Sequence, residues 1–363
     1  MMNNIKNKKV FVAMSGGVDS SVAAALLKTQ GYDVEGITMC FNVHYPGSKK
    51  PSCCGADGIQ DARQAAKILG ISHHVLDFEA DLKNFVVDDF VKEYLAGRTP
   101  NPCVRCNQLL KFGSLLKVAA ESGADYLATG HYAKVIYTDG AYELQKADDS
   151  LKDQSYFLYG IKKEFLPKIL FPLGDKRKDE VRELARHYQL NTAEKKESQD
   201  ICFVSDGGYQ AFVEEIVGKD TFVPGDFVNE QGKVVGKHKG IAHYTIGQRE
   251  KLGIALGFPV YVFKIDKVTN TVHVGRQDNL YARGLLASQL NWLAEEFPKE
   301  ILEVQARIRY NAREVKASLM YLTGDKVKIE FKEPQKSVTP GQSVVFYDRD
   351  IVLGGAVIDE AIL

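Results

Sequence analysis

Residues 10–21 read Val-Phe-Val-Ala-Met-Ser-Gly-Gly-Val-Asp-Ser-Ser, an apolar run that passes at once into two glycines and three serine hydroxyls. The run predicts a buried strand, and the spacing after it predicts a helix over residues 21–30 that ends at Gly31. Glycines let backbone N–H groups approach an anion closely, and a helix N-terminus adds a partial positive charge. The stretch therefore predicts a phosphate-binding loop, although a plain glycine-rich turn would share its two glycines.

This loop differs from the two most familiar phosphate-binding motifs. It lacks the Gly-Lys-Ser/Thr ending of a Walker loop and the third glycine of a dinucleotide-binding loop. Asp19 would repel a phosphate unless a cation lay between them, so we expect Asp19 to face Mg²⁺.

The fold class follows from how the pattern of apolar runs and turn residues changes along the chain. Apolar runs at 10–14, 34–39, 73–78 and 126–129 alternate with helical patterns, which predicts α/β architecture with a Rossmann-like parallel sheet. Asp139-Gly140 predicts a hairpin. Short β-like runs and turn signals dominate after about residue 221. We expect three domains: an ATP-binding α/β domain over 1–205, a small β-rich domain over 206–282 and a C-terminal β-barrel over 283–363.

Composition narrows the function classes. Lys and Arg number 47, as do Asp and Glu, so a protein that holds nucleic acid by bulk charge is not expected, although local basic patches remain open. The runs 176–178 and 195–196 are basic, and such runs are usually solvated surfaces. Six cysteines are too few for a disulfide scaffold in 363 residues. No apolar run reaches the roughly 18 residues of a membrane helix, so we expect a cytoplasmic protein.

The cysteines leave three interpretations open. Buried free cysteines are commonly small hydrophobic residues. Alternatively, Cys103 and Cys106 have the spacing of metal ligands. With Cys53 and Cys54 they could form a zinc site, or with Cys202 they could hold a 4Fe–4S cluster. In the third interpretation Cys106 and Cys202 perform redox sulfur chemistry, with the Cys106 thiolate stabilised by a helix start, capped by Asn107, and by Arg105.

Six stretches carry a resemblance to a known family: AMSGGVDS (13–20), GRTPNP (97–102), ATGHYA (128–133), DQSYFL (153–158), SQDICF (198–203) and HYTIGQR (243–249). The first resembles the loop of the PP-loop ATP pyrophosphatases. Together they resemble the bacterial tRNA-specific 2-thiouridylases, nearly from end to end. The resemblance implies that ATP adenylates O2 of the wobble uridine, and that sulfur from a cysteine persulfide then gives 2-thiouridine, AMP and diphosphate. It implies tRNA as the substrate and a sulfur-relay protein or cysteine desulfurase as the sulfur source.

By position, the family's nucleophile falls on Cys106 and its persulfide cysteine on Cys202, with Asp19 a further catalytic residue. The residues implied to bind ATP are Ala13, Met14, Ser15, Gly16, Gly17, Val18, Asp19, Ser20, Met39 and Gly130. The residues implied to contact the target base are Asn101, Pro102 and Cys103. The residues implied to contact tRNA are His131, Lys152, Asp153, Gln154, Tyr310, Asn311 and Gln342. Many members have Asp where this chain has Cys103, which leaves the role of Cys103 open.

Two other functions compete. A PP-loop enzyme acting on a small molecule would turn over ATP without tRNA. A non-catalytic RNA-binding protein with a structural zinc site would release no pyrophosphate. Neither accounts for the phosphate loop and the separated cysteines together.

Overall fold

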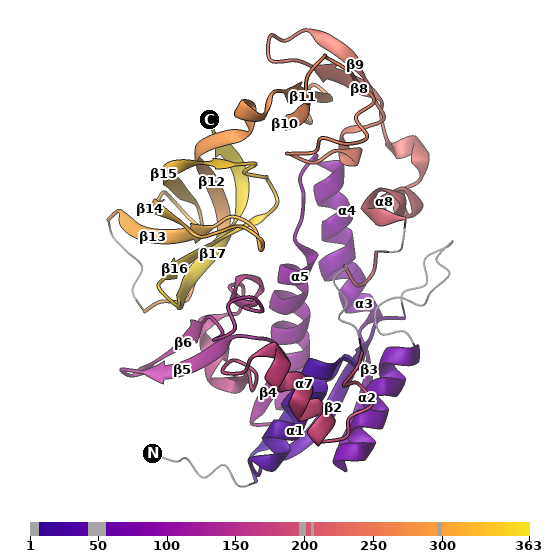
Figure 1. Ribbon diagram of the computed structural model, residues 1–363, viewed down its shortest axis with the longest axis vertical. Coiled ribbons are helices and arrows are strands. Elements are labelled where there is room, and N and C mark those ends of the chain that lie inside the picture. The colour runs from indigo at the N-terminus through magenta and orange to yellow at the C-terminus, as the bar shows by residue number, and fades with distance from the viewer. Residues whose placement is uncertain (1–6, 43–55, 196–200, 205–206, 296–299) are drawn as a thin grey trace.

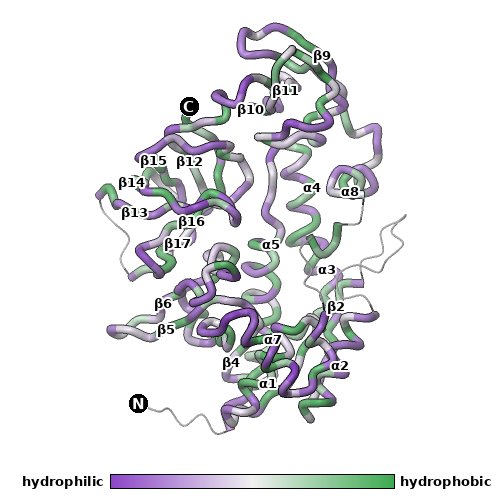
Figure 2. The backbone as a smooth tube through the Cα atoms, viewed as in Figure 1, coloured by the Kyte–Doolittle hydropathy of each residue, from purple (hydrophilic) through white to green (hydrophobic). Residues whose placement is uncertain are grey.

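The structure is a computed structural model that describes residues 7–42, 56–195, 201–204, 207–295 and 300–363. Its described strands form three sheets (Figure 1). Hydrophobic and hydrophilic residues alternate along the helices and strands (Figure 2). None of the helices in the described ranges is long and apolar enough to cross a membrane.

The first sheet is parallel and has the strand order β3-β2-β1-β4-β7. Its strands are β1 (Lys9–Ala13), β2 (Asp33–Cys40), β3 (Ser72–Asp77), β4 (Tyr126–Thr129) and β7 (Ile169–Leu170). Alternation along β1 sends Val10 and Val12 into one core and Phe11 into the core on the other face. The strand order reverses between β1 and β4, the point where open α/β sheets bind ligands.

Helices cover both faces of this sheet. On the face of Val10, one hydrophobic core contains residues of α1 (Val18–Thr29), α2 (Ala56–Leu69) and α7 (Lys178–His187). On the face of Phe11, a second core contains residues of α4 (Asp88–Leu95). The helix α3 (Glu79–Leu82) leads through a π-helical turn at Lys83–Val87 into α4.

A second helical column carries two of the cysteines. It runs through α5 (Pro102–Arg105), a π-helical stretch (Cys106–Leu115) and α6 (Leu116–Glu121). Asn101 is its N-cap, because the side-chain Oδ1 accepts a hydrogen bond from the N–H of Val104 at 3.3 Å. The expected start at Asn107 is therefore wrong. Asn107 is buried in the column and donates to the carbonyl of Phe157 at 3.1 Å.

The predicted hairpin is present as β5 (Lys134–Thr138) and β6 (Ala141–Gln145), with Asp139 and Gly140 both at positive φ. Gln145 of β6 pairs with Ile351, so the hairpin joins the edge of the C-terminal sheet. Several short 3-10 helices follow, including Ser155–Phe157 and Lys163–Lys168.

The second sheet is small and lies at the top of Figure 1. It follows α8 (Gly208–Val217) and has the order β10-β11-β8-β9. Its strands are β8 (Gly225–Val228), β9 (Val234–His238), β10 (Tyr261–Asp266) and β11 (Thr271–Gly275). Phe227, Val262, Val272 and Val274 form its fully buried centre.

Six of the eight strands of the third sheet close into a barrel, and the other two are the hairpin strands β5 and β6. The expected C-terminal β-barrel is confirmed. Its order is β12-β15-β14-β13-β16-β17, and β12 also pairs with β17. The strands are β12 (Tyr281–Trp292), β13 (Leu302–Arg307), β14 (Val315–Tyr321), β15 (Val327–Lys336), β16 (Ser343–Asp348) and β17 (Ile351–Ile362). The predicted fold class is confirmed, while the domain boundaries at 205/206 and 282/283 stay predictions.

Candidate active site

The predicted phosphate loop connects the end of β1 to the start of α1. Gly16 has φ +72°, and a Cβ there would lie 2.1 Å from the carbonyl oxygen of Gly58, so no larger residue fits. The Ser21 hydroxyl donates to the Gly17 carbonyl at 2.9 Å, and the Ser15 N–H donates to the Ser20 hydroxyl at 3.2 Å. Gly17 is the N-cap of α1 and provides no side-chain cap. The first N–H groups of α1 are thus available to an anion.

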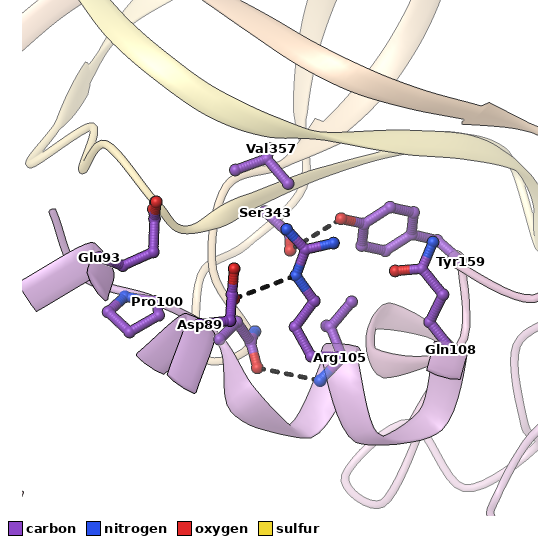
Figure 3. A pocket seen from close by; sticks show the side chains of 11 residues that line it. Asp89, Glu93, Pro100, Arg105, Gln108, Tyr159, Ser343 and Val357 are labelled. Carbon is purple, nitrogen blue, oxygen red and sulfur yellow. Dashed lines mark hydrogen bonds and ion pairs between the residues drawn. The ribbon is translucent and has the colours of Figure 1, made fainter. Parts of the chain in front are cut away.

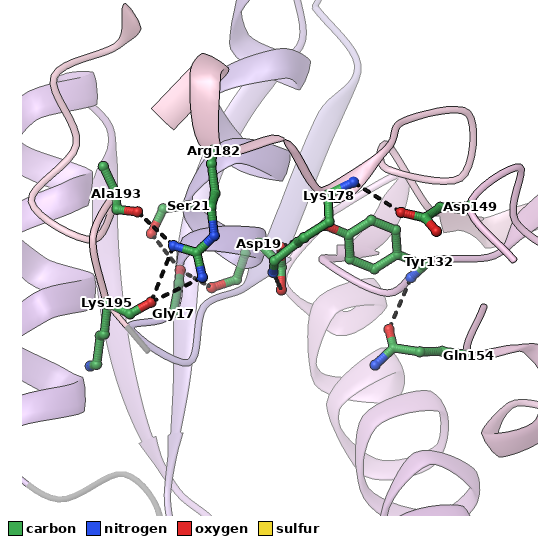
Figure 4. A network of polar contacts seen from close by, with 11 residues as sticks. Gly17, Asp19, Ser21, Tyr132, Asp149, Gln154, Lys178, Arg182, Ala193 and Lys195 are labelled. Atoms are coloured by element: carbon green, nitrogen blue, oxygen red, sulfur yellow. Dashed lines mark hydrogen bonds and ion pairs between the residues drawn. The ribbon is translucent and has the colours of Figure 1, made fainter. Parts of the chain in front are cut away.

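Asp19 lies in the first turn of α1 and is held by two side chains from distant parts of the sequence (Figure 4). Lys178 Nζ lies 2.7 Å from Oδ1 and 2.8 Å from Oδ2 of Asp19. The Tyr132 hydroxyl donates to Oδ1 at 2.8 Å. The Asp19 carboxylate therefore points to a place that the positively charged Lys178 ammonium occupies.

The other residues implied to bind ATP surround the loop at the carboxyl ends of the strands. A Cβ on Gly130, just after β4, would lie 2.6 Å from the N of Ser20, so Gly130 lets the segment approach α1 closely. Met39 and Met14 are buried. The Met14 carbonyl accepts from the Thr38 hydroxyl at 2.7 Å, so Ala13 and Met14 support the loop from inside the sheet.

Cys103 and Cys106 are three residues apart on the helical column, which puts both on one side of it. Cys103 and Cys202 are exposed, and Cys106 is half-buried. Although Cys103 keeps an exposed surface, the atoms around its sulfur desolvate it and raise its pKa to about 11. The Cys202 thiol raises the pKa of Cys103 further and the Lys111 charge lowers it, so both groups lie within electrostatic range of Cys103.

The Arg105 guanidinium, which the sequence suggested as a partner of the Cys106 thiolate, forms hydrogen bonds to two other side chains. Its Nε donates to Asp89 Oδ2 at 3.2 Å (Figure 3). Its Nη2 donates to Gln289 Oε1 at 2.8 Å. These bonds tie the helical column to α4 and to β12 of the barrel. The cation on the cysteine side of the column is Lys111.

The 4Fe–4S interpretation requires Cys103, Cys106 and Cys202 to converge on one cluster. Within the described ranges, no group of three or more His, Cys, Asp or Glu side chains is placed to hold a metal ion. The alternative zinc site would need Cys53 and Cys54, which lie outside the described residues.

His131 lies between the phosphate loop and the cysteine column. Its Nδ1 is 2.6 Å from the Thr129 hydroxyl and its Nε2 is 3.5 Å from Lys111 Nζ. Desolvation, helped by the Lys111 charge, holds the pKa of His131 well below its usual range. An ammonium can only donate, so Nε2 is the acceptor and the neutral ring carries its proton on Nδ1.

The residues implied to contact tRNA fall into two groups. Asn311 is exposed and Lys152 is partly exposed, so both can reach a ligand on the surface. Asp153 is buried, and its carboxylate accepts from the Ser155 hydroxyl at 2.9 Å and pairs with Arg307 at 3.3 Å. Gln154 Oε1 accepts from the N–H of Tyr132 at 3.0 Å.

Two more of these residues lie where the barrel meets the first domain. Gln342 Nε2 donates to the carbonyls of Thr99, at 2.9 Å, and Pro100, at 3.1 Å. The Tyr310 ring packs on Phe157, with centroids 4.5 Å apart. Gln342 thus holds the segment that leads into the implied base-contact residues Asn101, Pro102 and Cys103.

Sequence reasoning missed three lysines at this site. Lys178 and Lys195 belong to basic runs that usually face solvent, yet Lys178 pairs with Asp19 and Lys195 donates to the Gly16 carbonyl at 2.9 Å. Lys111 lies five residues after Cys106, on the helical column, and approaches His131. The available signal was the helical spacing of Lys111 from Cys103, at eight residues.

Three family models match successive parts of the chain. Residues 8–206 match a tRNA methyl transferase HUP domain, residues 210–276 a tRNA methyl transferase PRC-barrel domain, and residues 282–358 an aminomethyltransferase beta-barrel domain. This order agrees with the three sheets.

Full-length relatives are similar throughout. The tRNA-specific 2-thiouridylase MnmA 1 of Syntrophus aciditrophicus (strain SB) is 50% identical over 361 residues, covering 99% of this chain and 95% of that protein. The tRNA-specific 2-thiouridylase MnmA of Carboxydothermus hydrogenoformans is 49% identical over 364 residues, covering 99% of this chain and all (100%) of that protein. Among solved structures, the U34-tRNA thiolase NcsA from Methanococcus maripaludis, with its 4Fe-4S cluster, aligns over 61% of this chain and 67% of that chain. Its TM-score of 0.36 and identity of 22% are too low to carry a conclusion.

Proposed function

Since the chain belongs to the tRNA-specific 2-thiouridylase family, we propose that it thiolates the wobble uridine of tRNA at C2, using ATP and a cysteine persulfide. The observation that carries this proposal is the segment from Thr129 to Tyr132. Its Tyr132 hydroxyl reaches Asp19 of the phosphate loop, and its His131 ring reaches Lys111 of the cysteine column. An activated base between these two elements would meet both the adenylating and the sulfur-carrying groups.

ATP is proposed to bind with its phosphates on the N–H groups of residues 15–20, and with its adenosine along Met39 and Gly130. The geometry of the loop supports this, because Gly16 and the uncapped start of α1 leave N–H donors for an anion. Mg²⁺ fits Asp19, whose carboxylate already attracts a cation, and the metal would neutralise charge on the departing pyrophosphate.

The target uridine is proposed to enter beside Asn101, Pro102 and Cys103, flipped out of the anticodon loop. Its O2 attacks the α-phosphorus of ATP, an O–P bond forms, and pyrophosphate leaves. The adenylated oxygen can then depart from C2 as AMP, which is a far better leaving group than an oxide.

Sulfur transfer is proposed to use the two cysteines in turn. The terminal sulfur of the Cys202 persulfide attacks C2, and AMP leaves with the former O2. The Cys106 thiolate then attacks the Cys202 sulfur, which breaks the S–S bond to the base and leaves 2-thiouridine. The two thiols become a disulfide as the transferred sulfur is reduced, and a dithiol reductant must restore them.

Partner and location complete the proposal. A sulfur-relay protein or a cysteine desulfurase loads Cys202, which is exposed. The central and C-terminal domains, together with His131, Lys152, Tyr310 and Asn311, are proposed to hold tRNA, and the enzyme is proposed to work in the cytoplasm.

The deciding experiment measures pyrophosphate release from ATP with and without bulk tRNA, on protein purified without air. We expect release only with tRNA, followed by 2-thiouridine in the digested RNA by mass spectrometry. Release without tRNA would favour the small-molecule ligase. Stoichiometric zinc with no release would favour the RNA-binding protein.

A further inference from the structure

Lys195 contacts the phosphate loop from its outer side. Its Nζ donates to the carbonyl oxygen of Gly16 at 2.9 Å and to Asp61 Oδ2, on α2, at 2.5 Å. Lys195 and Gly16 are 179 residues apart in sequence. This contact is made to the backbone of the loop, at the Gly16 carbonyl, rather than to a side chain.

The bond to the Gly16 carbonyl fixes a phosphate-binding donor. The carbonyl of Gly16 and the N–H of Gly17 belong to one planar trans peptide group, so they point in opposite directions. Because Lys195 holds the Gly16 carbonyl, the Gly17 N–H is turned away from Lys195. Glycine at both positions would otherwise let this peptide rotate easily.

The backbone around Lys195 is itself anchored. Arg182 on α7 donates through Nη1 to the carbonyl of Ala193 at 2.9 Å, and both Nη atoms lie 3.5 Å from the carbonyl of Lys195 (Figure 4). The same helix provides Lys178, which holds Asp19. The helix α7 thus holds both Asp19 of the phosphate loop and the backbone at Ala193 and Lys195.

We propose that Lys195 is a positioning residue that sets the Gly16–Gly17 peptide for ATP. This inference rests on the proposed function, since it concerns the ATP site of that reaction. Binding of phosphate to the Gly17 N–H would polarise its peptide and strengthen the bond from Lys195 to the Gly16 carbonyl.

The test compares Lys195→Met with Lys195→Arg and with Lys117→Met. Lys117 is a matched control, because it also pairs with a carboxylate, that of Glu121, but on an exposed helix surface. The KM for ATP in tRNA-dependent pyrophosphate release should rise about tenfold in Lys195→Met, the loss expected for one charge-assisted hydrogen bond. Lys195→Arg keeps a donor and should restore most of this, and Lys117→Met should match the wild type. Equal KM values for ATP in Lys195→Met and the wild type would overturn the inference.

Two further comparisons keep the result decisive. If Lys195→Met does not fold, Asp61→Asn weakens the hold on the Lys195 ammonium and should give a smaller rise in KM of the same kind; no rise would count against the inference. If the wild type makes no 2-thiouridine, the proposed function itself fails. If the wild type makes 2-thiouridine and all Lys195 variants have the same KM for ATP as the wild type, only the inference about Lys195 fails.

Discussion

Lys178 and Asp19 form an ion pair in which the ammonium lies 2.7 Å and 2.8 Å from the two carboxylate oxygens, although 159 residues separate them in sequence. The lysine side chain is 12% exposed and the aspartate 30%. The carboxylate proposed to face Mg²⁺ is therefore neutralised by the protein when no nucleotide is bound. If ATP binds with Mg²⁺ as proposed, its phosphates would be placed to accept from the Lys178 ammonium, and the Asp19 carboxylate would be free to hold the metal.

This pairing predicts a measurable coupling between the two residues. Lys178→Met, Asp19→Asn and the double variant should show an interaction of about 1 kcal/mol in the free energy of unfolding, because neighbouring charges in partial burial are not additive. Urea unfolding of all four proteins measures it. Tyr132→Phe removes only a neutral donor to Asp19 and should cost less. Strict additivity would contradict the ion pair.

The cysteines predict a separation of the two half-reactions. Cys106→Ser and Cys202→Ser should retain tRNA-dependent pyrophosphate release but form no 2-thiouridine, because adenylation needs neither thiol. Pyrophosphate assays and nucleoside mass spectrometry on the same samples test this. Cys40→Ser is the control, since Cys40 lies at the end of β2, where its thiol donates to Asn42 at 3.1 Å. Normal thiolation by either variant would remove that cysteine from the mechanism.

Cys103 predicts a distinctive pH dependence. Desolvation raises its pKa to about 11, so the thiol stays protonated at neutral pH and should react slowly with iodoacetamide until the pH approaches that value. Cys202→Ala should lower this pKa and Lys111→Met should raise it, since those neighbours act in opposite directions. Alkylation rates between pH 7 and pH 11, mapped by mass spectrometry, test both shifts. Rapid alkylation of Cys103 at neutral pH would contradict the desolvated environment of its thiol.

Much of the fold was accessible from local patterns. The run at 10–14, the glycines after it and the Asp139-Gly140 turn act within a few residues, so the strand, the loop and the hairpin could be predicted. The start of the cysteine column was missed although Asn101 and Pro102 provide a helix-start signal, an N-cap followed by proline. The π-helical stretch at Cys106–Leu115 breaks the 3.6-residue spacing on which helix prediction rests.

The charged contacts of the site were hidden for another reason. Lys178 and Lys195 resemble the many lysines that face solvent, and only the fold brings them to residues 159 and 179 positions away. Arg105 shows the converse: its place beside Cys106 in sequence suggested a thiolate partner, while the column directs it to Asp89 and Gln289. Sequence proximity on a helix does not determine which side a long side chain faces.

His131 predicts a loss of stability at acid pH. Desolvation keeps the folded-state pKa of His131 well below the value near 6.5 of the unfolded chain, so below about pH 6.5 only the unfolded state takes up the proton. The free energy of unfolding should therefore fall as the pH drops from 7.5 to 5.5. His131→Gln should reduce this fall, and urea titrations at both pH values measure it. An unchanged pH dependence in the variant would show that other histidines account for the effect.

Gln342 predicts that the barrel positions the base-contact segment. Gln342→Ala removes two hydrogen bonds to the carbonyls of Thr99 and Pro100, next to Asn101, and should cost about 1–2 kcal/mol of folding free energy. Because the lost bonds orient the segment proposed to receive the uridine, 2-thiouridine formation should fall further than ATP binding does. Gln335→Ala is the matched control, since that partly exposed glutamine donates to the backbone carbonyl of Glu333 on its own strand. Equal thiolation rates for the two variants would mean that Gln342 contributes to stability alone.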